Sequence, residues 1–325
     1  MIERARIRRY FKEYKVSNIV AMIRNSSKPA KVCQDRFDRK LVVITGATSG
    51  IGYYTARKYA SMGANLLCVN RNLERSEKLK KEIELTYGVR CEYYIADLSV
   101  LKEIHGAAGY LLNLDQNIDV LIHNAGVYYT RKQVTVDGLE KVFVVNYLSS
   151  FIINYILLEK FKRQKSGRII LVNSEGHRFA VWGIDIDDIN WERRRYSGLK
   201  SYGAAKNAQL LSMLVFNELL RGSGVTINAM HPGAVRTESG KDNDPVYKWV
   251  KKNIYDKMLK SPEISAEALY YLGVSKEIED ISGKFFNLTT LEEPAPPALD
   301  KEVANQLWGL SIRLAKLDEF LKGAV

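Results

Sequence analysis

A buried strand followed by a glycine-rich turn is the feature that most constrains the fold of this chain. Leu41-Val-Val-Ile-Thr45 is apolar and largely β-branched, which is typical of a strand buried on both faces. The pattern Gly46-x3-Gly50-x-Gly52 ends that strand, and a helical spacing of apolar residues follows it. At such a turn the free backbone N–H groups and the positive helix end favour an anion, and glycine lets it come close. The turn predicts a pyrophosphate site, with a tight turn that binds nothing as the alternative.

Apolar strands alternate with helical segments after this turn. We expect further strands at residues 65–69, 91–96, 120–123, 169–172, 225–230 and 283–288. This alternation implies right-handed crossovers, so we predict an α/β fold with a Rossmann-like, doubly wound parallel sheet of about seven strands. In such sheets ligands bind beyond the carboxyl ends of the strands, where Asp97, Asn124 and Ser174 also fall.

The residue after the second strand indicates which dinucleotide the site prefers. A carboxylate there would bind the adenine-ribose hydroxyls and repel a 2′-phosphate, but the sequence has Asn70-Arg71. Arginine is a permanently charged partner for phosphate. Arg71 therefore favours NADP over NAD, and the alternative is an arginine that only faces solvent.

Positive charge is concentrated at the N-terminus. Residues 1–40 hold twelve Lys and Arg against four Asp and Glu, a net +8 of the chain's +12. We therefore interpret residues 1–40 as a basic arm and linker, and we expect no nucleic-acid partner. Within the arm, Ile7, Tyr10, Phe11 and Tyr14 have helical spacing and predict an amphipathic helix in residues 1–24. Two interpretations stay open: the helix packs on its own domain, or it makes peripheral contact with an anionic membrane.

Other features of the sequence indicate the cellular compartment and the structure of the remaining segments. Three widely spaced cysteines, with no metal-ligand spacing, favour a reducing, cytoplasmic environment and no metal site. The uncharged run of residues 142–158 contains several polar residues and predicts a buried helix instead of a membrane span. Residues 238–260 mix charged and apolar side chains as a substrate lid would, and residues 291–325 are expected to form a proline-containing tail with a helix.

A tyrosine and a lysine share one face of a predicted helix. Tyr202 and Lys206 stand four positions apart, so both can point into one site, although chance often supplies such a pair. A phenol titrates near 10, and a neighbouring cation would lower its pKa enough for proton transfer near neutrality.

Taken in order, these motifs resemble the short-chain dehydrogenase/reductase family from about Leu41 to Leu288. The segments Glu175-Gly-His-Arg-Phe179 and Asp187-Asp-Ile-Asn-Trp191 are similar to its retinol dehydrogenase and WW-domain-containing oxidoreductase branch. Asn173 departs from the family, which often has serine there.

The resemblance implies hydride transfer between NADP(H) and a lipophilic alcohol or carbonyl compound. Tyr202 would be the general acid and base, Lys206 would stabilise its phenolate, Ser174 would orient the substrate oxygen, and Asn146 would support a water. The residues implied to bind the cofactor are Thr45, Gly46, Ser49, Gly50, Ile51, Gly52, Arg71, Asp97, Leu98, Asn124, Ala125, Gly126, Tyr202, Lys206, Pro232, Gly233 and Thr237. A homo-oligomer is a further expectation, and the dehydrogenase domain would span residues 41–290. The rival hypothesis is a non-catalytic dinucleotide-binding scaffold that acts through its basic arm.

Overall fold

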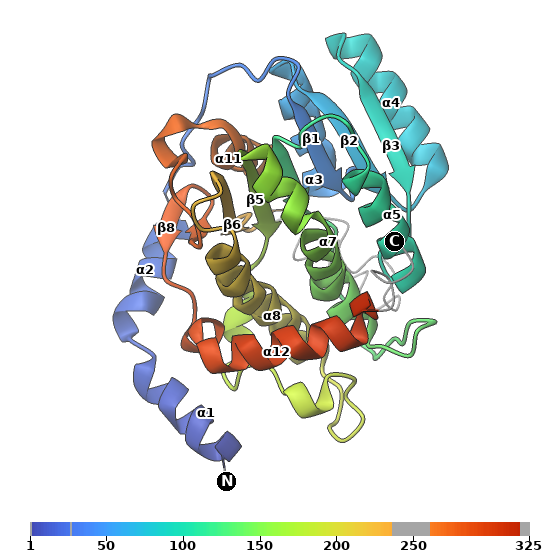
Figure 1. Cartoon of the computed structure of the whole chain (residues 1–325). Coiled ribbons are helices and arrows are strands. Elements are labelled where there is room, and N and C mark those ends of the chain that lie inside the picture. Colours follow the sequence, from blue (N-terminus) through green and yellow to red (C-terminus); the bar gives the residue numbers. More distant parts are fainter. Residues whose placement is uncertain (1, 27, 236–260, 319–325) are drawn as a thin grey trace.

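A single eight-stranded sheet forms the centre of the molecule (Figure 1). The computed structural model describes residues 2–26, 28–235 and 261–318. The strand order is β3-β2-β1-β4-β5-β6-β7-β8. Strands β1 to β3 are added in one direction along the sheet, and β4 and the later strands are added in the other direction, starting beside β1. The strands are β1 (Leu41–Thr45), β2 (Asn65–Asn70), β3 (Cys91–Ile95), β4 (Val120–His123), β5 (Gly167–Val172), β6 (Val225–His231), β7 (Phe285–Asn287) and β8 (Thr290–Glu292).

The expected doubly wound parallel sheet is confirmed, with one strand more than predicted. Strands β1 to β7 pair in parallel, as in the register of Val42 with both Leu66 and Val120. The additional strand, β8, turns back and pairs antiparallel with β7. The predicted domain boundary at residue 290 therefore falls inside a hairpin. A three-residue strand shows no periodicity of its own, so pairing with β7 is what defines it.

Helices cover both faces of the sheet because side chains alternate along each strand. Val42 and Ile44 face one apolar cluster with Tyr59 and Leu269, whereas Val43 faces the other with Phe151. The helices are α3 (Gly50–Ser61), α4 (Leu73–Tyr87), α5 (Leu101–Leu112), α6 (Lys141–Phe143), α7 (Ser149–Gln164), α8 (Gly198–Leu219), α11 (Glu263–Val274) and α12 (Lys301–Leu314). Short turns of other helix types are η1 (Val144–Leu148), η2 (Glu175–Phe179), η3 (Ile186–Asp188), η5 (Lys276–Ile278) and η6 (Pro296–Leu299).

The uncharged segment forms part of the core. Residues Lys141–Gln164 are continuous helix, long and apolar enough to cross a membrane, but 83% of the most apolar window is buried inside the structure. Phe151 lies against Phe216 and Trp308, with ring centres 5.6 and 4.9 Å away. The predicted buried helix is therefore confirmed, and its apolar side chains pack against α8 and α12.

The N-terminal arm forms two helices instead of one, α1 (Ile2–Glu13) and α2 (Val16–Ser26), and both lie against the C-terminal part of the chain (Figure 1). Tyr10 is 1% exposed and donates a 2.7 Å hydrogen bond to Asp300, with which Arg9 forms an ion pair. The predicted apolar stripe is only partly correct, because Phe11 is 59% exposed. No proline or glycine marks the break at Tyr14-Lys15, so local sequence did not reveal it.

The linker between α2 and β1 has no helix or strand in its described residues 28–40, yet it contacts the rest of the protein. The Lys31 amide donates to Thr289 Oγ1 at 2.8 Å, and Cys33 is buried in the cluster around Tyr59. The predicted lid, residues 238–260, lies outside the described residues.

Candidate active site

The glycine-rich turn between β1 and α3 has the conformation that its glycines predict. Gly46 and Gly50 have φ values of +70° and +54°, a region that other residues rarely adopt. A Cβ on Gly52 would lie 2.2 Å from the carbonyl oxygen of Gly46, so only glycine fits there. The turn leaves the N-terminus of α3 free of a side-chain cap, and its backbone N–H groups can bind an anion.

Polar side chains at the ends of β1 and β2 fix this turn and the turn that follows β4. Thr45 is 2% exposed, and its hydroxyl accepts from the amides of Asn124 and Ala125 at 3.0 and 3.1 Å. Asn70, which sequence reasoning did not assign to the site, accepts from the Ala47 amide at 2.8 Å. Asn70 could have been assigned to the site from the sequence, because it is a polar residue at the end of a buried strand. Thr45 and Gly52 stabilise the turn but do not line the cavity that is described next.

An open cavity of about 600 Å³ runs along the carboxyl ends of the strands, within the range of small-molecule sites. Of the predicted site residues that the structure describes, all but Thr45, Gly52 and Asn146 line it. Those residues are Gly46, Ser49, Gly50, Ile51, Arg71, Asp97, Leu98, Asn124, Ala125, Gly126, Ser174, Tyr202, Lys206, Pro232 and Gly233. Thr237 lies outside the described residues.

At one end of this cavity Arg71 lies beside Asp97. The Arg71 Nη1 is 4.0 Å from the Asp97 carboxylate, and the two side chains are 52% and 30% exposed. Such an exposed pair contributes little, so the guanidinium can still bind a phosphate. Asn72 and Arg75 line the same end and were not predicted.

At the other end Ser174, Tyr202 and Lys206 converge. Ser174 follows β5, and its hydroxyl accepts from the Gly176 amide at 3.0 Å. The Lys206 ammonium donates to the Val172 carbonyl at 2.7 Å and lies 5.8 Å from the centre of the Tyr202 ring. A Cβ on Gly176 would lie 2.7 Å from the Tyr202 ring, so this backbone packs directly on the phenol.

Burial, and not the nearby cation, dominates the electrostatics of these groups. It raises the pKa of Tyr202 above its usual value, although a hydrogen bond with Ser174 acts in the opposite direction. Burial also lowers the pKa of Lys206 to about 7. The predicted lowering of the tyrosine pKa is therefore not present in this state of the protein.

Asn146 and Asn173 act on the backbone around the site. Asn146 lies in η1, and its side chain both donates to and accepts from the main chain of Val127, at 2.9 and 2.7 Å. Asn173, at the position that departs from the resemblance, donates to the Lys206 carbonyl at 2.9 Å. Asn173 thus joins the end of β5 to α8, and Ser174 keeps its place after the strand.

Together, the parallel sheet, the glycine turn and the convergent serine, tyrosine and lysine define a dinucleotide-binding oxidoreductase. Residues 40–184 match the family described as short chain dehydrogenase. The chain is 37% identical over 286 residues to retinol dehydrogenase 13 from Homo sapiens, covering 86% of this chain and 85% of that protein. The chain belongs to the short-chain dehydrogenase/reductase family.

Two further comparisons support the branch and the fold. The WW domain-containing oxidoreductase from Pongo abelii is 31% identical over 299 residues, which cover 89% of this chain and 71% of that protein. A short-chain dehydrogenase from Sphingobium yanoikuyae, solved in complex with NADPH, is 26% identical with a TM-score of 0.56, covering 71% of this chain and 82% of that one.

Proposed function

We propose that this protein interconverts a lipophilic alcohol and its carbonyl compound with NADP(H). The observation that carries the proposal is the convergence of Ser174, Tyr202 and Lys206 on the cavity that begins at the glycine turn. The residues fit a dinucleotide, because Gly46 and Gly50 keep the turn open and the α3 N-terminus is available for a pyrophosphate. The nicotinamide supplies or accepts the hydride.

In the direction of reduction, Tyr202 donates its hydroxyl proton to the substrate oxygen, and Ser174 donates a hydrogen bond that orients it. Lys206 is held near Tyr202 by the Val172 carbonyl and stabilises the phenolate that remains. Asn146 orders the Val127 backbone at the cavity wall and supports a water by which Lys206 reaches solvent. In oxidation the same groups act in reverse.

Two sets of side chains support the choice of cofactor and substrate class. Arg71, with no carboxylate after β2 that would bind the ribose hydroxyls, favours the 2′-phosphate of NADP(H). Val127, Tyr128 and Val235 give the cavity an apolar wall suited to a lipophilic substrate. The 37% identical relative is a retinol dehydrogenase, which favours the same class.

A panel of lipophilic and polar alcohols and carbonyl compounds, followed by NADPH absorbance, tests the proposal. We expect turnover of lipophilic members that Tyr202→Phe abolishes. Tight NADPH binding with no turnover across the panel would instead support the scaffold hypothesis.

We further propose that the arm contacts an anionic membrane surface while it packs on the body. Phe11, Val20 and Ile23 are 58–65% exposed on an arm rich in Arg and Lys. The test is co-sedimentation with anionic vesicles: we expect binding that salt reverses and that Ile23→Glu weakens. Leu85→Glu, at a site 77% exposed on α4, is the matched control, and equal binding by both variants would overturn this proposal.

A further inference from the structure

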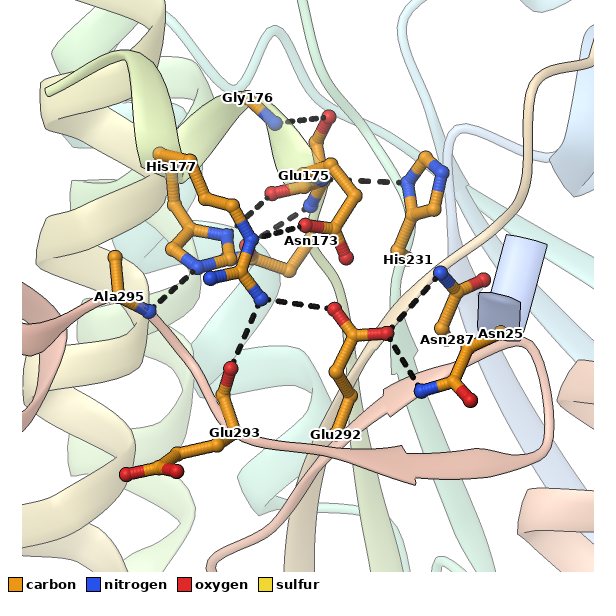
Figure 2. Close-up of polar contacts among 12 residues, drawn as sticks. Asn25, Asn173, Glu175, Gly176, His177, His231, Asn287, Glu292, Glu293 and Ala295 are labelled. Carbon is orange, nitrogen blue, oxygen red and sulfur yellow. Dashed lines mark hydrogen bonds and ion pairs between the residues drawn. The ribbon is translucent and has the colours of Figure 1, made fainter. Parts of the chain in front are cut away.

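A buried ionic cluster lies beside the segment of Asn173, Glu175 and His177 (Figure 2). The same segment carries Ser174. Arg178, in η2, donates from Nε to Glu175 at 2.5 Å and from Nη2 to Glu292 at 2.8 Å. The Arg178 and Glu292 side chains are only 9% and 2% exposed. We call Glu175, Arg178, Glu292 and Asn25 the Arg178 cluster. Glu175 and Glu292 accept hydrogen bonds from one buried guanidinium and so fix its position, because no water can replace these partners.

The Arg178 cluster connects three parts of the chain that are distant in sequence. One Glu292 oxygen accepts from Arg178, while the other accepts from Asn25 of α2 at 3.0 Å and from Asn287 of β7 at 3.3 Å. Asn25 is 5% exposed, so this contact is part of the interior (Figure 2). The arm, the β7–β8 hairpin and the Ser174 segment are therefore joined at Glu292.

The Ser174 segment depends on such contacts for its conformation. His177 Nε2 accepts from the Ala295 amide at 3.0 Å, so its Nδ1 carries the proton and donates to the Ser174 carbonyl at 2.8 Å. Burial lowers the pKa of His177 to about 3, in agreement with a neutral ring. The Glu175 amide donates to His231 Nδ1 at 3.3 Å, which holds the segment from β6.

We propose that Arg178 and Glu292 are positioning residues for the reaction, and that Asn25 completes their site from the arm. This inference rests on the proposed function. Displacement of η2 would move the Ser174 hydroxyl and also the Gly176 backbone that packs on the Tyr202 ring. A shift of about 1 Å in reacting groups can lower the rate about a hundredfold, whereas the glycine turn and the Arg71 end of the cavity are built from other elements. The cluster should therefore affect kcat more than cofactor binding.

The experiment compares Glu292→Gln with Glu293→Gln. Both remove one carboxylate at adjacent positions, but the Glu293 side chain is exposed and pairs with Asn18 outside the cluster. For Glu292→Gln we expect kcat to fall about tenfold or more, while the Kd for NADPH stays within about twofold. Glu293→Gln should retain wild-type values. Asn25→Ala leaves every charge in place and should lower kcat by a smaller factor. If Glu292→Gln does not fold, Asn25→Ala tests the positioning role by itself.

Unchanged kcat in both Glu292→Gln and Asn25→Ala, even with a lower melting temperature, would overturn the proposal and leave the cluster with a role in stability alone. Hydrogen–deuterium exchange provides a readout that does not require turnover. We expect faster exchange of the amides of residues 174–178 in Glu292→Gln than in Glu293→Gln. If the wild-type protein reduces no substrate, the proposed function fails, whereas equal exchange in the two variants contradicts the positioning role itself.

Discussion

The Lys206 ammonium donates a 2.7 Å hydrogen bond to the Val172 carbonyl. This bond joins the helix that carries Tyr202 to the strand that precedes Ser174, so the two residues that we propose as catalytic are held by one contact. Because Lys206 is buried, its pKa is lowered to about 7, and the ammonium is poised to exchange its proton near neutrality.

Replacing Tyr202 with phenylalanine tests the proton-transfer role. We expect turnover to fall by at least about a hundredfold, since general acid catalysis contributes about 10²–10⁴-fold, while the Kd for NADPH changes little. Steady-state kinetics and a fluorescence titration of NADPH check the two parts. Tyr110→Phe is the matched control, because Tyr110 is 42% exposed on α5 and does not line the cavity. Turnover by Tyr202→Phe close to that of wild type would disprove the assignment.

Replacing Arg71 with alanine tests the cofactor preference. We expect weaker NADP(H) binding by about 1.5 kcal/mol, the lower end for a hydrogen bond to a charged group, because Arg71 is half-exposed to water. NAD(H), which lacks the 2′-phosphate, should be affected little. Calorimetric titration of both cofactors measures the difference, with Arg90→Ala on the exposed surface as the control. An equal loss of binding free energy for the two cofactors would show that Arg71 does not bind the 2′-phosphate.

Acid should destabilise the protein partly through His123. Its imidazole is buried, which lowers its pKa to about 4 from 6.5, so between these values the unfolded chain binds more protons than the folded one. Stability must then fall as the pH falls, by about 2 kcal/mol from His123 alone between pH 7 and 5.

Urea unfolding of wild type and His123→Gln at pH 7 and pH 5 measures this contribution. The pH-dependent loss should be smaller in the variant, whatever its stability at pH 7. Glu175 acts in the opposite sense, because burial raises its pKa to about 7, but it contributes equally to both proteins. The same pH-dependent loss in both proteins would exclude His123 as a cause.

Deleting the arm tests whether it is separable from the part of the chain that binds the cofactor. Every residue that lines the described cavity lies at Gly46 or beyond, so a chain that lacks residues 1–26 should still bind NADPH. It loses the Tyr10 bond to Asp300 and should melt several degrees lower, at about 2–4 °C for each kcal/mol. Deletion of residues 1–36 should cost more, because Cys33 is part of the core. Loss of NADPH binding on either deletion, measured by titration and thermal unfolding, would argue against a separable arm.

Much of the fold followed from local patterns. Helix α4 spans Leu73–Tyr87 because Asn72 caps its first turn and Gly88 ends it with a φ of +67°. The glycine-rich turn and the positions of the parallel strands were also predicted correctly, since β-branched runs and glycines act over a few residues. The Tyr202–Lys206 spacing likewise brings two side chains to one helix face wherever the helix lies.

Contacts between distant segments decided the rest. Strand β8 exists because β7 pairs with it, and the arm divides into two helices that contact Asp300 and Glu292 separately. The support given by Asn70 to the glycine turn and the Arg178 cluster depend on side chains that meet only after folding. The sequence alone therefore determined the α/β class and the glycine-rich turn, and it nominated the side chains that we propose to react. Only the tertiary structure decided their pKa values and the support behind Ser174, because burial and long-range ion pairs arise from packing and have no local signal.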